Sequence, residues 1–219
     1  MTRGPGAPKF RAMIIAVDGP TASGKGTIAR ALAAHFSLPY LDTGLLYRAV
    51  GRQCALTGGD PDKAKDALAA CAFPEALLDD PELRSEESGG YASRVSIHPP
   101  VREALYERQR AFATQPGGAV LDGRDIASVI APEAEARLFV TASVEARAQR
   151  RFEEMAAQGR AVTLEAISAD LAARDERDRS RKDAPLVVAE GALVIDTSAL
   201  RREEAIAAAI AAVDAFAAA

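Results

Sequence analysis

The feature that most constrains the fold is an apolar run that leads directly into a glycine-rich loop and a helical pattern. Residues 13–17 read MIIAV, residues 19–27 read GPTASGKGT and residues 28–36 read IARALAAHF. Gly19, Gly24 and Lys25 fit the Gly-x4-Gly-Lys frame, in which backbone N–H groups close around phosphate oxygens at a helix N-terminus. This arrangement of strand, loop and helix predicts a phosphate-binding P-loop.

The residues inside this loop indicate which kind of nucleotide chemistry it serves. Lys25 is expected to bridge the β- and γ-phosphates of ATP, and the Thr27 hydroxyl to serve a phosphate or Mg²⁺. Gly26 stands where switch GTPases need Ser or Thr, and Asp122 in AVLDGRD is followed by Gly123 rather than the acidic residue usual in ATP-driven motors. Gly-Lys-Gly-Thr is instead typical of small nucleoside monophosphate kinases. The expected ATP-binding residues of the loop are Gly19, Pro20, Thr21, Ala22, Ser23, Gly24, Lys25, Gly26 and Thr27.

The remaining chain alternates short apolar runs with helical patterns. Further strands are expected at 39–41, 119–121, 137–140 and 192–195, and helices at 25–36, 44–57, 100–113, 143–158, 163–182 and 201–217. Apolar runs without polar alternation suit strands buried on both faces, as in a parallel sheet. The alternation of strand and helix predicts a three-layer α/β core.

Composition excludes several classes of function. The net charge of −4 over 219 residues argues against general binding to nucleic acid or an anionic membrane. No stretch approaches 18 consecutive apolar residues, so we expect no membrane span, and a cytoplasmic protein. Two histidines (His35, His98) and two separated cysteines (Cys54, Cys71) give almost no material for a metal site built from His and Cys ligands. The basic, Pro- and Gly-rich residues 1–11 are expected to be a disordered tail.

Two segments depart from the alternation and are expected to be lobes attached to the core. Residues 58–95 are helix-prone but interrupted by Pro and Gly, and residues 159–184 carry a dense run of charge. On a helix, the second segment has one face that is apolar in its first half and charged in its second. This face either is solvated, with ion pairs such as Arg174–Asp178 and Asp175–Arg179, or delivers arginines to phosphates. The residues of the face are Leu164, Ile167, Leu171, Arg174, Asp178 and Arg181, with Arg177 beside them.

Five segments in this order resemble the bacterial cytidylate kinases. They are DGPTASGKGT, YLDTGLLYR, PPVREALYERQRAF, VLDGRDIASVI and ARDERDRSRKDAPL, and the likeness covers roughly residues 13–216. The resemblance implies a P-loop kinase fold with a five-stranded parallel sheet, an ATP-covering lid and a lobe for the nucleoside monophosphate. We therefore expect one kinase domain at 12–219, with its core at 12–42, 114–158 and 185–219, the monophosphate lobe at 43–113 and the lid at 159–184.

The resemblance also implies roles for individual residues. It places the acceptor phosphate against Arg48, Arg124 and Arg181, cytosine near Thr43, Arg102 and Asp125, and the sugar near Ser93, Arg174 and Asp178. Lys25, Arg124 and Arg181 would then be catalytic, Arg177 and Arg179 would bind ATP phosphates, and Asp122 would orient Mg²⁺ through water. The implied reaction transfers the γ-phosphate of ATP to CMP or dCMP. The sequence does not indicate an oligomeric state, and a monomer is the default expectation.

The sequence departs from the family pattern at two places. Many members have Ser where Thr43 stands, and the segment between Arg48 and Arg102 is shorter than in longer members, which carry a small β-sheet there. Because this segment lacks strand-like alternation, we expect that sheet to be reduced or missing. Two other functions remain open: a P-loop kinase acting on AMP, UMP or a small metabolite, and a nucleotide-binding switch module without useful catalysis.

Overall fold

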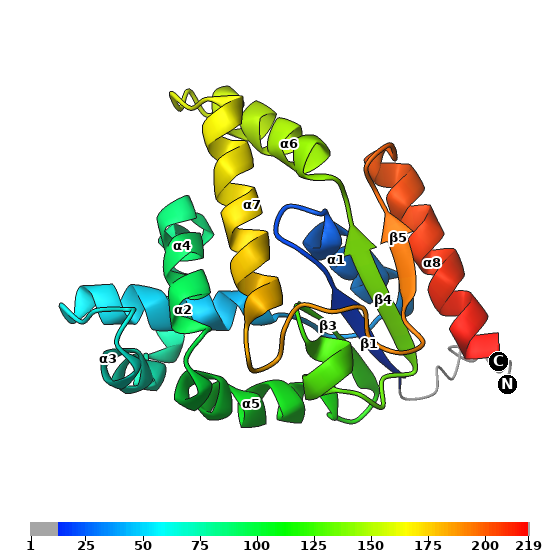
Figure 1. The fold of residues 1–219 in the computed structure, drawn as a ribbon. Helices are drawn as coiled ribbons and strands as arrows, with labels where there is room; N and C mark the ends of the chain where they lie inside the picture. The colour runs from blue at the N-terminus through cyan, green and yellow to red at the C-terminus, as the bar shows by residue number, and fades with distance from the viewer. Residues whose placement is uncertain (1–12, 219) are drawn as a thin grey trace, which may run out of the picture.

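A five-stranded parallel sheet forms the centre of the molecule (Figure 1). The computed structural model describes residues 13–218, so the tail expected at 1–11 lies outside the described residues. The strand order is β2-β3-β1-β4-β5. The strands are β1 (Met13–Asp18), β2 (Tyr40–Asp42), β3 (Gly118–Gly123), β4 (Ala136–Thr141) and β5 (Leu193–Asp196).

The helices lie close to the predicted ranges, with additional short ones in the lobe. They are α1 (Lys25–Phe36), α2 (Thr43–Leu56), α3 (Ala64–Ala69), α4 (Glu86–Val95), α5 (Pro99–Ala113), α6 (Val144–Ala157), α7 (Leu164–Ser180) and α8 (Arg202–Ala218). Three 3₁₀ turns, η1 (Ala70–Ala72), η2 (Glu75–Asp79) and η3 (Pro81–Arg84), and one π-helical turn, η4 (Ile126–Ile130), complete the described elements.

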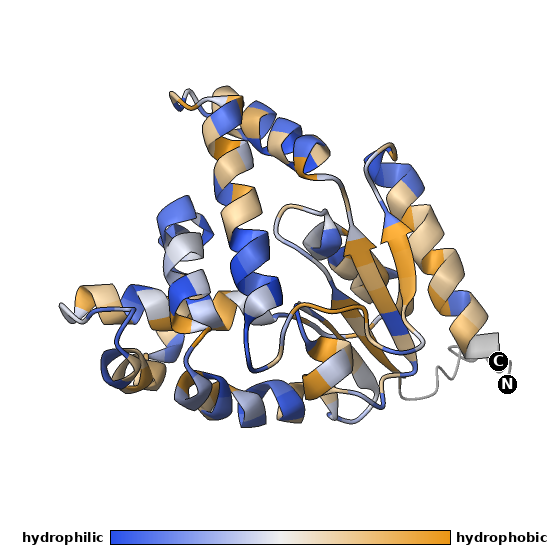
Figure 2. Cartoon of the chain, viewed as in Figure 1, coloured by the Kyte–Doolittle hydropathy of each residue, from blue (hydrophilic) through white to orange (hydrophobic). Residues whose placement is uncertain are grey.

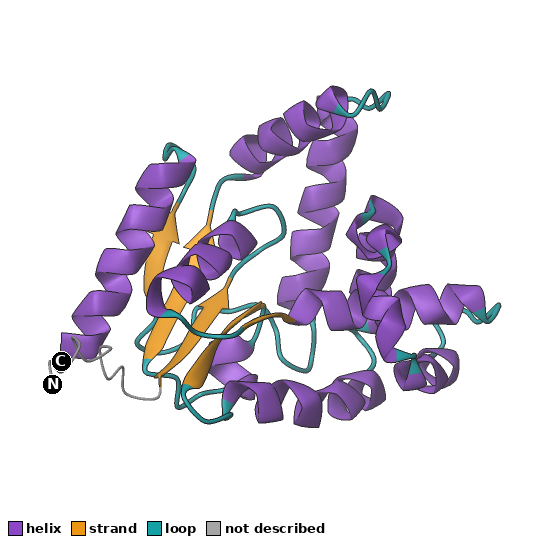
Figure 3. Ribbon diagram, turned by 180° about the vertical axis from the view of Figure 1, so that it is seen from behind, coloured by secondary structure: helices purple, strands orange, loops and turns teal. Residues whose placement is uncertain are grey.

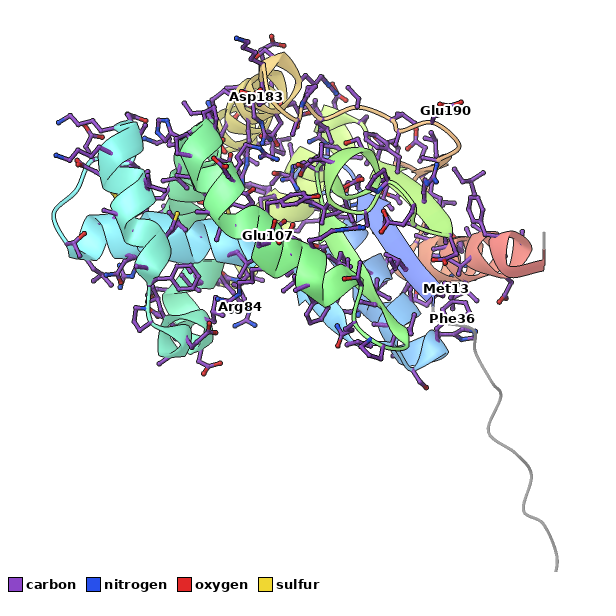
Figure 4. The ribbon with its side chains drawn as sticks, turned by 90° about the horizontal axis from the view of Figure 1, so that it is seen from below. Met13, Phe36, Arg84, Glu107, Asp183 and Glu190 are labelled. Atoms are coloured by element: carbon purple, nitrogen blue, oxygen red, sulfur yellow. The ribbon has the colours of Figure 1, made fainter. Side chains whose placement is uncertain are left out.

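Alternate residues of β1 face two separate layers of helix, which gives the predicted three-layer core. Met13, Ile15 and Val17 pack with α1 and α8. Ile14 and Ala16 pack on the other face with the end of α5 and with η4. Figure 3 shows α1 and α8 together on one side of the strands, and Figure 4 shows Met13 and Phe36 close together at the end of the core away from the lobe that carries Arg84.

Burial on both faces holds for β1 and β3 but is wrong for the other strands, and in β4 buried residues alternate with partly buried ones. Every residue of β1 and β3 is buried. In β5, Leu193 and Val194 are about half exposed, at 46% and 51%, and β2 is only partly buried. Both strands stand at the ends of the strand order, where one flank has no neighbouring strand of the sheet to cover it.

Residues 43–113 form a helical lobe with its own apolar core, built by α2, α3, α4 and α5 with the 3₁₀ turns. No strand occurs between residues 57 and 99 of the described chain, which confirms that the small sheet of longer family members is missing. The segment expected to be the lid, 159–184, contains α7, which packs on α6 through a small cluster of Ala148, Met155, Ile167 and Leu171. Figure 2 shows α7 to be apolar over its first half and hydrophilic over its second, where it passes the sheet.

Candidate active site

The P-loop joins β1 to α1 through backbone conformations that favour glycine. Gly19 has φ 153°, and a Cβ there would lie 2.0 Å from the carbonyl oxygen of Val140. Gly24 has φ 87° and precedes Lys25, the first residue of α1. Ala22 also has a positive φ, of 61°, which is unfavourable for a residue with a Cβ. The loop thus turns sharply and directs the amides at the start of α1 toward one place.

A cavity of about 310 Å³ opens beside this loop. Residues from the P-loop, the lobe, the end of β3 and the lid all line it, so the topology brings distant segments to one place. Every residue expected from the resemblance to bind the acceptor nucleotide lies in this lining: Thr43, Arg48, Ser93, Arg102, Arg124, Asp125, Arg174, Asp178 and Arg181. Lys25, Thr27 and Asp122 line it as well.

Opposite charges are paired at two positions in the cavity wall. Arg102 on α5 donates through Nη2 to Asp125 Oδ2, and both side chains are at most 10% exposed. Asp178 on α7 accepts from Arg124 Nε at 2.8 Å and from Arg181 Nη2 at 2.6 Å. Without these carboxylates the arginines would face one another, so the pairs hold the guanidinium groups in place before an anion arrives.

Two polar side chains of the same cavity, Thr43 and Ser93, are also held by hydrogen bonds. Thr43 donates its hydroxyl hydrogen to the carbonyl oxygen of Asp122 at 2.7 Å, which leaves its oxygen free to accept. Ser93, buried on α4, accepts from Arg177 Nε at 3.2 Å. Burial raises the pKa of Asp125, and the neighbouring Arg102 works against that rise.

Excess positive charge surrounds the mouth of the P-loop. Burial, followed by repulsion from Arg124, lowers the pKa of Lys25 to about 8 and that of Arg174 to about 10. Arg174 Nε has no hydrogen-bond partner among the described residues, and Arg48 donates only to the carbonyls of Leu83 and Ser85, at 2.8 and 3.0 Å. A buried cation without a carboxylate is costly, so this region of the cavity favours a polyanion.

The position after the P-loop lysine is explained by Asp122 at the end of β3. A Cβ at Gly26 would lie 2.9 Å from Asp122 Oδ2, so Ser or Thr there would displace the carboxylate. Tyr40 donates to the same oxygen at 3.0 Å. Burial, and then the charge of Asp42, raise the pKa of Asp122 to about 6. The carboxylate of Asp122 is therefore held against the first turn of α1, where its oxygens could serve as metal ligands.

Two predicted ATP-binding arginines lie outside this cavity. Arg177 lines a second cavity of about 1130 Å³, which also includes Thr21, Ala22 and Gly24 of the P-loop. Arg179 lines neither cavity; its side chain is 60% exposed and lies 3.9 Å from Asp175. The predicted pair of Asp175 with Arg179 is thus only a long contact, and it is not solvated, because Asp175 is buried. Arg174 lines the first cavity. Gly19, Pro20 and Ser23 line neither cavity.

The predicted helix over 163–182 is too long. α7 ends at Ser180, and Arg181 follows it with φ −56° and ψ 135°, an extended conformation. Arg181 nevertheless reaches the cavity because the chain turns there and its guanidinium is drawn to Asp178, one helical turn earlier. The helical pattern therefore placed Arg181 on the correct side of the segment, although the helix ends one residue before it.

Three buried polar residues around the site were missed or misassigned in the sequence: Asp18 and Arg147 were not singled out, and Asp175 was expected to be solvated. Asp18 accepts from the backbone N–H groups of residues 126 and 127, both at 2.8 Å. Arg147 and Asp175 form a bidentate ion pair that is 2% exposed on each side. Asp18 directly precedes the Gly-x4-Gly-Lys frame and could have been noticed there, but nothing distinguishes Arg147 among the arginines of EARAQRR.

The chain is similar to known proteins over almost its whole length. The cytidylate kinase family model matches residues 15–215. A cytidylate kinase of Xanthobacter autotrophicus is 54% identical over 93% of this chain and 98% of its own, and one of Azorhizobium caulinodans is 53% identical over 92% and 98%. A solved structure of an uncharacterised protein from Eubacterium ventriosum has a TM-score of 0.52 and 13% identity, covering 94% of this chain and 99% of its own. That structural likeness concerns the fold alone.

Proposed function

The chain belongs to the cytidylate kinase family, and we infer that it transfers the γ-phosphate of ATP to CMP or dCMP, giving CDP or dCDP. The observation that carries this inference is the cavity itself. One hollow of about 310 Å³ combines a P-loop with the Arg102–Asp125 pair and with arginines that have no carboxylate of their own. A base, a sugar and a phosphate are three chemically different groups, and this lining offers a matching surface for each.

We propose that Asp125 and Arg102 bind the cytosine ring. Cytosine carries an exocyclic amine donor beside two ring acceptors, N3 and O2, so a carboxylate and a guanidinium side by side match its edge. The two groups are bonded to each other in the wall of the cavity, which fixes their spacing. Thr43 lies in the same lining with a free acceptor oxygen and would complete the contact.

The phosphate of the acceptor would lie against Arg48, Arg124 and Arg181, and its sugar near Ser93, Arg174 and Asp178. A dianionic phosphate would give Arg48 an anionic partner and would share Arg124 and Arg181 with Asp178, and bidentate guanidinium contacts suit it. Phosphoryl transfer needs little covalent help from the protein, because in-line positioning and neutralisation of charge carry most of the rate. Lys25, Arg124 and Arg181 would neutralise the charge that spreads over the transferring group.

The residues at the start of α1 fit a magnesium ion delivered with ATP. Mg²⁺ keeps several waters and takes one or two protein oxygens plus phosphate oxygens. Thr27 and Asp122 supply such oxygens in one cavity lining, and residues 13–218 contain no group of three or more His, Cys, Asp or Glu side chains able to form a full cage. Bound there, Mg²⁺ would draw charge from the β- and γ-phosphates.

The remaining properties are proposed on chemical grounds. Within the described range, none of the helices combines the length and apolar character needed to cross a bilayer. We propose that the protein acts as a monomer, because one chain supplies every residue named above. We place it in the cytoplasm, where its nucleotide substrates are made. Thr21, Ala22, Gly24, Lys25, Gly26 and Thr27 would bind ATP phosphates, with Arg177 above them; Arg179 would need to move to contribute.

A coupled assay that presents each nucleoside monophosphate in turn tests this proposal. We expect ADP production with CMP and dCMP, with UMP at least an order of magnitude poorer in kcat/KM and AMP and GMP poorer still. Preference for AMP, UMP or a small metabolite would instead support the second kinase hypothesis. Slow ATP hydrolysis that ignores every monophosphate would support a switch module and overturn the proposal.

A further inference from the structure

Arg147 lies beneath the P-loop, outside both cavities, and all of its bonds go to fixed protein groups. It sits in the first turn of α6 and is 1% exposed. Its Nε donates to the carbonyl of Ala142 at 3.0 Å and its Nη1 to the carbonyl of Thr21 at 3.1 Å. Its two Nη atoms also donate to Asp175 on α7, at 3.0 and 2.5 Å. A buried ion pair gives little net stability, so its bonds call for another explanation.

The bond to Thr21 controls the direction of the next amide. The peptide between Thr21 and Ala22 is trans, so the N–H of Ala22 points to the side opposite the carbonyl that Arg147 holds. Ala22 has a φ of 61°, a conformation that costs an alanine roughly 1–2 kcal/mol and persists only where its surroundings hold it. Ala22 lines both cavities and also packs against the apolar cluster of the lid.

Helix α7 therefore holds Thr21 through two parallel relays. Asp178 binds Arg124, whose Nη2 donates to the Thr21 hydroxyl at 2.6 Å. Asp175, nearly one turn earlier, binds Arg147, which holds the Thr21 carbonyl. Arg124 and Asp178 line the acceptor cavity and are available to a substrate, whereas Arg147 and Asp175 line neither cavity. The bonds from Asp175 through Arg147 to Thr21 can therefore remain in place when Arg124 and Asp178 bond to a substrate instead of to each other.

We propose that Arg147, held by Asp175, is a positioning residue for ATP: it fixes the Ala22 amide toward the phosphates and ties the lid helix to the P-loop. The proposal rests on the proposed function only in taking ATP as the P-loop ligand. Loss of Arg147 should weaken the binding of ATP rather than that of the acceptor nucleotide. Arg147 donates to the P-loop, and it contacts none of the residues proposed to bind the base.

Paired substitutions separate this role from a structural one. In Arg147→Met, Asp175 keeps a buried charge without its partner, so we expect the Tm to fall. In the double variant Arg147→Met with Asp175→Leu, apolar groups replace both charges, so most of the Tm lost in Arg147→Met should be recovered. The double variant should still bind a non-hydrolysable ATP analogue at least about tenfold more weakly by calorimetry, and its KM for ATP should rise while that for CMP changes much less.

The matched control is Glu75→Ala with Arg108→Ala, which removes an exposed bidentate pair, with both bonds at 2.7 Å, on the outside of the lobe. It should leave both substrates' KM values unchanged. A double Arg147/Asp175 variant with restored Tm and wild-type affinity for the analogue would overturn the proposal. If that variant does not fold, Arg147→Lys replaces it: lysine can face Asp175 but cannot also reproduce the fork to Thr21, so wild-type analogue affinity there would likewise refute the role. Analogue binding needs no CMP turnover, so failure of the proposed function is seen separately.

Discussion

Asp18, the last residue of β1, fastens the loop that carries Arg124 and Asp125. Its two carboxylate oxygens accept from the backbone N–H groups of Ile126 and Ala127, both at 2.8 Å. The side chain is buried, and burial raises its pKa to about 7 even though these two bonds favour the charged form. A carboxyl with that pKa changes its charge near neutral pH, next to the segment that carries Arg124 and Asp125.

This shift predicts a pH dependence of stability. The folded-state pKa of about 7 lies above the ordinary value of 3.8, so between these values the folded protein holds a proton that the unfolded chain releases. The contribution of Asp18 to stability is therefore present at low pH and lost as pH rises through about 7. We expect the free energy of unfolding of the wild type, relative to Asp18→Asn, to fall from about pH 5 to about pH 8 in urea titrations. A difference independent of pH would contradict the shift.

Single residues were predictable where a motif or an unusual charge marked them. The P-loop lysine could be named from the spacing of its motif, whereas the arginines of the cavity could be named only from the resemblance to the cytidylate kinases. Arg147 could not, because its function depends on a carbonyl 126 positions away along the chain. The resemblance assigned Arg179 to the ATP phosphates, yet its side chain is 60% exposed and lies beside Asp175.

At the scale of elements, α4 is a helix that local propensity argues against. Gly89 and Gly90 lie in its interior, where glycine is unfavourable by roughly 1 kcal/mol each relative to alanine. Packing supplies the reason at one position: a Cβ at Gly89 would lie 3.2 Å from Arg174 Nη1 and 3.4 Å from Arg48 Nη2. The lobe helix thus leaves room for two arginines of the site. Helix α4 is therefore stabilised by tertiary contacts, which the periodicity of the sequence does not reveal.

Elements of the lobe and the lid also contact each other through Glu86 at the start of α4. Its carboxylate lies 3.2 Å from Arg151 Nε on α6 and 3.6 Å from Arg160 Nη2 in the loop before α7. All three side chains are partly exposed, so each pair contributes only about 0.2–1 kcal/mol. Together they bias the lid toward the lobe.

We expect Glu86→Gln to increase the opening of the lid by up to a few-fold in the absence of nucleotides. Hydrogen exchange over residues 159–180 should be faster in this variant, and protection should become equal to wild type when ATP and CMP are both present. Glu87→Gln is the matched control, because Glu87 accepts from Tyr91 within the same helix at 2.7 Å. Exchange that is identical in Glu86→Gln and wild type would show that the ion pairs do not hold the lid.

At the scale of the whole molecule, the architecture could be predicted because its pattern repeats along the chain. Each short apolar run predicted a strand, and the alternation of strands with helices predicted a parallel sheet with a layer of helices on either face. The order of the strands could not be predicted from the periodicity of the sequence. Nothing in the residues of β5 indicates an edge strand, and its two exposed apolar residues resemble those of a buried strand. The acceptor cavity is likewise a property of the whole molecule, since helices of both lobes and the ends of the central strands build it.

In the proposed complex, Asp125 binds the cytosine and Arg124 binds the nucleotide phosphate. Uracil has a carbonyl where cytosine has its amine, so UMP would face the carboxylate without a donor, at a cost of about two orders of magnitude in kcat/KM. The most direct test measures kcat/KM for CMP and UMP in wild type, Asp125→Ala and Arg124→Ala. We predict that Asp125→Ala lowers CMP activity strongly and UMP activity much less, whereas Arg124→Ala lowers both alike. An equal loss for CMP and UMP in Asp125→Ala would contradict the claim.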